Sequence, residues 1–166
     1  MSAVLRPAAL PRRMAVGDID AVLAIEQAAY AFPWTHGNFV DSVAAGHWSE
    51  LHFDTEGRLA AYAVALPVVD EMHLLNLTVA PALQGRGRAR ALLDRLQAEC
   101  RERSLVTLWL EVRVSNTRAR RLYGWRGFDE VGLRRAYYPA PHGEREDAVV
   151  MRLMLPSAGR ADGALD

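Results

Sequence analysis

The spacing of apolar residues changes several times along the chain, and it is helical at the start. In residues 17–30 the apolar side chains recur at one, three and four steps, which is typical of an amphipathic helix: Ile19, Val22 and Leu23. Asp18 stands at the N-cap position, and Glu26 is expected on the polar side. Residues 35–45 predict a second short helix.

Strand patterns follow, interrupted by two more helical segments. Residues 48–53 and 59–66 predict a hairpin around a turn at 54–57. Further strands are expected at residues 74–79, 106–112, 128–131 and 147–155, with helices from Gly87 and from Ser115 or Asn116 to about Trp125. This order predicts a single α/β (α+β) domain over residues 1–155, followed by a disordered tail at 156–166.

Composition limits the possible partners. The 166 residues contain 51% hydrophobic amino acids, enough for one core but too few residues for two ordinary domains. Twenty basic and twenty acidic residues leave no net charge to attract nucleic acid or a membrane, and we expect neither as a partner. The lone cysteine, Cys100, and the lack of a long apolar run predict a cytoplasmic protein.

The strongest chemical signal is a strand, a glycine-containing turn and a helix at residues 77–89. Glycines let backbone amides approach a ligand, and a helix N-terminus adds unpaired donors and positive dipole charge. Such a turn is suited to a pyrophosphate. The alternative is an ordinary turn whose arginines are merely solvated: Arg86, Arg88 and Arg90.

The turn resembles the Gln/Arg-x-x-Gly-x-Gly/Ala signature of the GNAT superfamily of N-acetyltransferases, with Gln84, Gly87 and Ala89 at the fixed positions. The resemblance implies a central mixed, mostly antiparallel sheet flanked by helices, and acetyl-CoA as cosubstrate. It assigns the cofactor-binding role to Leu77, Thr78, Val79, Gln84, Gly85, Arg86, Gly87, Arg88, Ala89, Arg90 and Asn116. Asn116 could equally be only a helix N-cap.

Other segments resemble the RimI subfamily, the ribosomal-protein-alanine N-acetyltransferases. They are residues 31–34, 108–116, 122–128, 134–139 and 145–148. The resemblance implies that the acceptor is a protein N-terminus, either the N-terminal alanine of small-subunit ribosomal protein eighteen or a broader set of protein N-termini. An extra residue in the loop His142 to Arg145 departs from the subfamily pattern and leaves the loop's shape open.

The same resemblance implies that Glu111 is the general base, acting through water, and that Tyr123 is the acid that protonates the CoA sulfur. Alternation places Glu111 on one strand face with Trp109 and Arg113. The alternatives are an ion pair between Glu111 and Arg113 or another cation, and a Tyr123 ring that only packs in the core.

Two groups of residues are candidates for the acceptor site: the aromatic residues Phe32, Trp34, Tyr137 and Tyr138, and the acidic residues Asp70 and Glu71. The first group could instead belong to the core, and the second could be solvated turn charges. The five histidines form no convincing metal set, so no metal is expected. Cys100 lies on an apolar helix face, which indicates an inert thiol and direct transfer.

The lower pKa of an α-ammonium group favours an α-amine over a lysine side chain as the acceptor. An α-amine titrates near 7.7–8.0 and lysine near 10.4, so neutralising lysine at pH 7 costs roughly 3 kcal/mol more. Two other functions remain open at this stage. One is acetylation of a small amine such as a polyamine or antibiotic, and the other is acyl-CoA binding without catalysis.

Overall fold

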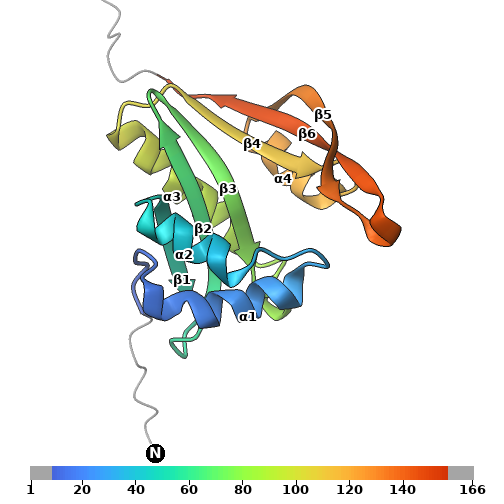
Figure 1. Cartoon of the computed structure of the whole chain (residues 1–166). Coiled ribbons are helices and arrows are strands. Elements are labelled where there is room, and N and C mark those ends of the chain that lie inside the picture. Colours follow the sequence, from blue (N-terminus) through green and yellow to red (C-terminus); the bar gives the residue numbers. More distant parts are fainter. Residues whose placement is uncertain (1–8, 157–166) are drawn as a thin grey trace, which may run out of the picture. The chain divides into compact units, whose positions relative to one another are not determined.

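The computed structural model describes residues 9–156, so the tail expected at 156–166 lies outside the described residues except for Pro156. The chain forms two compact units. The first comprises the residues up to Leu66 together with Leu75–Leu93, and the second comprises Pro67–Leu74 and the residues from Asp94 onward. Figure 1 shows their helices and strands along the chain.

The first unit begins with the two predicted helices, α1 (Ile19–Ala29) and α2 (His36–Ala44), after a 3-10 turn, η1 (Val16–Asp18). Asp18 occupies the N-cap position of α1, as predicted, but its carboxylate makes no capping hydrogen bond to the helix. Instead it accepts from the Ala15 amide at 2.8 Å and pairs with Arg12. Thr35 caps α2, accepting from the Asn38 amide at 3.2 Å.

Glu26 was predicted to lie on the polar side of α1, and this prediction is wrong. The residue is buried, with 2% of its surface exposed. It stands four residues after Val22 and seven after Ile19, so a period of 3.6 brings all three to the same face of α1. A carboxylate can be buried there because donors from the surrounding elements bind to it.

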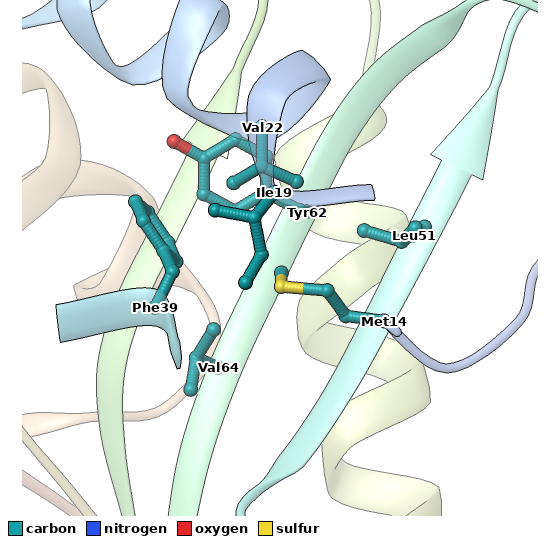
Figure 2. Packing of buried hydrophobic residues seen from close by; sticks show 7 residues of the cluster. All are labelled: Met14, Ile19, Val22, Phe39, Leu51, Tyr62 and Val64. Carbon is teal, nitrogen blue, oxygen red and sulfur yellow. The ribbon is translucent and has the colours of Figure 1, made fainter. Parts of the chain in front are cut away.

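The strands of the first unit are β1 (Trp48–Phe53), β2 (Leu59–Val68) and the later part of β3 (Glu71–Val79). β1 and β2 form the predicted antiparallel hairpin, with Leu51 opposite Tyr62. A core joins α1 and α2 to these strands, and Figure 2 shows its members: Met14, Ile19, Val22, Phe39, Leu51, Tyr62 and Val64.

The 3-10 turn η2 (Pro81–Leu83) leads through the glycine turn into α3 (Arg88–Glu102). The helical spacing seen in the sequence is confirmed, since the four residues on its apolar face are fully buried: Leu92, Leu93, Leu96 and Cys100. The helix therefore starts directly at the glycine turn, as predicted.

The second unit contains β4 (Thr107–Arg113), α4 (Thr117–Trp125), β5 (Asp129–Pro139), the turn η3 (Pro141–Gly143) and β6 (Arg145–Met154). β6 pairs antiparallel with both β4 and β5, and the start of β3 pairs parallel with β4. Arg120 links α4 to β5 through Glu130 at 2.8 Å. β5 extends eight residues beyond the predicted end at Val131.

Hydrogen bonding orders the six strands β1-β2-β3-β4-β6-β5. β3 takes part in both units, because Glu71–Leu74 belong to the second and the rest of the strand to the first. One parallel pair among antiparallel pairs confirms the predicted mixed, mostly antiparallel sheet with flanking helices.

Candidate active site

The glycine turn of the first unit has the geometry that a phosphate site needs. Gly85 and Gly87 adopt positive φ angles of 76° and 77°, which side chains other than glycine rarely accept. No atom lies within 4 Å of the place that a Cβ at Gly87 would occupy. Gln84 closes the turn by donating from Nε2 to the Val79 carbonyl at 3.2 Å. The turn thus presents an open stretch of backbone before α3.

The residues that follow supply positive charge. Arg86 and Arg90 are exposed, whereas Arg88 is half-buried and donates to the Phe53 carbonyl at 3.4 Å. The first amides of a helix have no partner within the helix, so the start of α3 can donate to an anion. Backbone donors, an unobstructed glycine and arginines together fit the pyrophosphate of acetyl-CoA.

Leu77, Thr78 and Val79 form the end of β3 before this turn. Tyr30, which follows α1, donates its hydroxyl to the Leu77 carbonyl at 3.2 Å, and its oxygen lies 2.9 Å from the Thr78 hydroxyl. The strand expected to bind pantetheine is therefore also joined to the segment after α1.

Glu111 lies in β4 of the second unit, and the predicted alternation is confirmed. Leu108, Leu110 and Val112 are buried, whereas Trp109, Glu111 and Arg113 are half-buried on the other face. The carboxylate of Glu111 forms an ion pair with Arg134 of β5, at 3.2 Å. The cation suggested by sequence proximity, Arg113, instead pairs with Glu146 at 3.0 Å.

Tyr138 also contacts Glu111. Its hydroxyl donates to the Glu111 carbonyl at 3.0 Å, and the Arg113 guanidinium lies 4.6 Å from its ring centroid. Burial raises the pKa of Tyr138 above its ordinary value, so the hydroxyl remains a donor at neutral pH. Tyr137 is more exposed and lies edge-on to Tyr138.

The β5 segment that carries these residues departs from regular pairing. The register shifts between Arg134 and Tyr138, and Ala136 has a positive φ of 48°. Asp147 accepts from the Ala136 amide at 2.7 Å. Arg145 donates to the carbonyls of Ala136 and Tyr137, both at 2.6 Å. Two side chains of β6 therefore hold this bulge in place.

Tyr123 and Asn116 lie on α4 in the same unit. Tyr123 is buried, with its ring centroid 5.6 Å from that of Phe128. Asn116 is confirmed as a helix cap, since its side chain accepts from the Ala119 amide at 3.1 Å. The packing role of Tyr123 and the capping role of Asn116 are thus established.

The remaining acceptor-site candidates divide between the units. In the first, Phe32 is exposed, whereas Trp34 is half-buried against the core with its ring centroid 5.2 Å from that of Phe39. In the second, Asp70 is exposed in a turn, and Glu71 starts β3 and pairs with His73 at 3.3 Å.

Residues 19–128 match the Acetyltransferase (GNAT) family. The chain belongs to this family. The GNAT chain is 41% identical over 138 residues to the [ribosomal protein bS18]-alanine N-acetyltransferase of Haemophilus ducreyi, covering 83% of this chain and 94% of that protein. It is 43% identical to the enzyme of the same name from Escherichia coli strain K12, over 83% and 92% of the two chains.

A solved structure of an enzyme with the same named activity is also similar to this chain. The crystal structure of the ribosomal-protein-S18-alanine N-acetyltransferase from Escherichia coli matches with a TM-score of 0.83 and 39% identity. The match covers 92% of this chain and 97% of that one. The GNAT chain is accordingly an acetyl-CoA-dependent N-acetyltransferase of the RimI type.

Sequence reasoning missed three polar residues in this GNAT chain. Arg134 was recognised as part of a motif but not as the ion-pair partner of Glu111. Their pairing depends on the register of β5 with β6 and on the register of β6 with β4. Tyr30 carries no signal in the sequence. Glu26 does carry one, since its spacing from Val22 already indicates the apolar face.

Other features bear on the chemistry. Cys100 is buried, as predicted, and burial raises its pKa to about 11, so the thiol is protonated at neutral pH. Within residues 9–156, no cluster of three or more His, Cys, Asp or Glu side chains is arranged to hold a metal. No helix in this range is long and apolar enough to span a membrane.

Proposed function

We propose that this enzyme acetylates the N-terminal α-amine of a protein, and that the acceptor is the N-terminal alanine of ribosomal protein bS18. The observation that carries the proposal is 41–43% identity over more than nine-tenths of the length of enzymes named for that reaction. The cytoplasm, where ribosomal proteins are available, is the expected compartment.

The glycine turn and the start of α3 are assigned to the cofactor. Backbone amides near Gly85 and Gly87 would donate to the pyrophosphate, with the arginines at 86, 88 and 90 adding charge. Leu77, Thr78 and Val79 would align the pantetheine, and Asn116 would contact it while capping α4. Acetyl-CoA supplies a thioester carbonyl carbon that an amine can attack.

Glu111 is assigned as the general base. An α-ammonium must lose one proton before its nitrogen attacks, and Glu111 would accept that proton through a water molecule. The C–N bond then forms, the C–S bond breaks, and the nitrogen releases its second proton to water to give the amide, after which Glu111 returns its own proton to solvent. Because Arg134 already binds the carboxylate, the arriving ammonium replaces one cation with another.

Tyr123 is assigned as the general acid. The departing sulfur needs a proton, since the parent thiol has a pKa of about 8.5, and the Tyr123 hydroxyl would donate it. The phenolate would then recover a proton from solvent. Transfer is direct, because the lone cysteine is buried and protonated.

The acceptor peptide is assigned to the aromatic residues Phe32, Trp34, Tyr137 and Tyr138. The rings of Phe32 and Tyr137 are exposed, and the Tyr138 hydroxyl donates a hydrogen bond to the Glu111 carbonyl. Asp70 and Glu71 would attract a basic residue further along the peptide. Rigid aromatic rings and a few carboxylates are suited to the first residues of a basic protein.

The decisive experiment measures released thiol with a peptide that begins with the bS18 alanine and contains a lysine. The control is the same peptide with a blocked N-terminus. Activity on the free N-terminus alone supports the proposal, whereas equal activity on both peptides indicates a lysine acetyltransferase. A polyamine tested in parallel identifies a small-amine enzyme, and cofactor binding without any turnover identifies a non-catalytic acyl-CoA-binding protein.

A further inference from the structure

Glu26 is a buried carboxylate surrounded by donors, all of them in the first unit. Its Oε1 accepts from the Trp34 amide at 2.9 Å. Its Oε2 accepts from the Tyr62 hydroxyl and from Asn76 Nδ2, the latter at 3.1 Å. Thr78 lies 3.5 Å from the same oxygen and donates to Asn76 Oδ1 at 2.8 Å. The two carboxylate oxygens thus join α1, β2, β3 and the segment after α1.

The donors to Glu26 differ in whether they belong to a regular element of secondary structure. Asn76 and Thr78 belong to β3, and Tyr62 belongs to β2, so backbone pairing in the sheet fixes their positions. Residues 30–35 lie outside the helices and strands. The Trp34 amide in this segment is bound by a charged acceptor, and charge-assisted bonds are the stronger kind. A change at Glu26 therefore acts first on this segment.

A stabilising role alone is a poor explanation for Glu26. Removing a carboxylate from water is costly, and a buried ion often contributes less stability than an apolar residue of the same size. A carboxylate only accepts hydrogen bonds, and the three donors bonded to Glu26, the Trp34 amide, the Tyr62 hydroxyl and Asn76 Nδ2, are oriented by it. Burial and the bond to Glu26 raise the pKa of Tyr62, which keeps its hydroxyl a donor.

We propose that Glu26 is a positioning residue for the acceptor: through the Trp34 amide it holds residues 30–34 against β3, so that Phe32 and Trp34 meet the incoming N-terminus. This role rests on the proposed function, because it assumes that these two residues line the acceptor site. Glu26 itself is buried and acts through its hydrogen-bond partners.

The test compares Glu26→Gln with Glu50→Gln. Glu50 is the matched control because it is a buried carboxylate of the same unit that bonds to His52 within β1. We expect Glu26→Gln to raise the KM for the Ala-starting peptide about tenfold, the effect of one charge-assisted hydrogen bond. The KM for acetyl-CoA should change less than about twofold, and Glu50→Gln should leave both values unchanged.

Two further variants keep the test decisive. Glu26→Asp retains the charge and shortens the side chain, so it serves if Glu26→Gln does not fold, and it should also raise the peptide KM. Tyr62→Phe removes one donor but leaves the Trp34 bond, so its peptide KM should stay close to that of the parent. If the peptide KM is unchanged in the folded Glu26 variants, Glu26 is structural only and the proposal is wrong.

Hydrogen exchange separates this inference from the proposed function. The Trp34 amide should exchange faster in Glu26→Gln while the β3 amides stay protected, whether or not the peptide is a substrate. If the parent enzyme does not acetylate the peptide, the proposed function fails but the exchange result still decides whether Glu26 holds the segment. Unchanged exchange at Trp34 would refute the positioning role even if the enzyme acetylates the peptide.

Discussion

Arg134 Nε lies 3.2 Å from Glu111 Oε1. The proposed general base on β4 is therefore already paired with a cation of β5. The pair is partly solvated, with 56% of the Arg134 side chain and 20% of the Glu111 side chain exposed. A pair of this kind is weak enough to exchange partners. An α-ammonium is a cation of the same charge, so in the proposed mechanism it and its bridging water would compete with Arg134 for the carboxylate.

The first prediction concerns Arg134. In Arg134→Gln the ammonium no longer displaces a guanidinium, so the peptide KM should fall by about two- to fivefold, the range of a half-exposed ion pair. Steady-state kinetics with the Ala-starting peptide measures this. A lower kcat at constant KM would show instead that Arg134 orients Glu111.

The second prediction concerns Glu111. Glu111→Gln keeps the shape but cannot accept a proton, and kcat should fall by roughly 10²- to 10⁴-fold. The dissociation constant for acetyl-CoA, measured by calorimetry, should be unchanged. Glu130→Gln, which alters an exposed carboxylate of β5, is the control. Parent-like turnover in Glu111→Gln would exclude this residue as the base.

The third prediction concerns Tyr123. Tyr123→Phe keeps the ring against Phe128 but removes the hydroxyl, so the fold should persist while kcat drops by about 10²-fold or more. Thermal unfolding and thiol release measure the two effects. A parent-like kcat would show that the ring serves packing alone.

The fourth prediction separates backbone strain from cofactor contact. Gly87 and Gly57 have φ angles of 77° and 79°, and both have open space where a Cβ would stand. Alanine at either position should cost about 1–2 kcal/mol of stability. Only Gly87→Ala should weaken acetyl-CoA binding, by about tenfold, because its methyl group would obstruct the pyrophosphate. Equal affinities in the two variants would argue against a cofactor role for the turn.

The fifth prediction concerns pH. Hydrogen bonds from Ser115, and then the Arg113 guanidinium, lower the pKa of Glu146. The unfolded value is near 4.3, so this stabilisation is complete above that pH and is lost as the pH falls through the lower folded value. The free energies of urea unfolding of the parent and of Glu146→Gln should therefore differ at pH 7 and converge only when the pH falls below the lowered folded pKa of Glu146. A constant difference at all pH values would contradict this assignment.

The sequence predicted the elements whose period is regular and missed those determined by tertiary partners. Leu108, Leu110 and Val112 alternate with half-buried residues, and the strand predicted at 106–112 lies within one residue of β4 at each end. β5 continues eight residues beyond the predicted end at Val131, because pairing with β6 overrides the low strand propensity of Gly132. Local pattern cannot reveal such pairing.

The candidate site shows the same limit. The turn and the helix that follows it were predicted correctly, since both depend on consecutive residues, whereas the cofactor-binding role of the turn stays a prediction. The cation beside Glu111 was not predicted, because Arg134 lies 23 positions away and meets Glu111 only through strand register. Glu26 was misassigned because residue type was weighed above spacing, although its position relative to Val22 is that of a core residue.

The bulge at Ala136 also bears on how this enzyme could be redesigned. Two side chains, Asp147 and Arg145, bind its backbone in addition to the pairing of β5 with β6 on either side. Mutations at these two positions can therefore reshape the surface around Tyr137 while the scaffold beneath it stays intact. A combinatorial library confined to them offers a compact route to variants with new acceptor preferences.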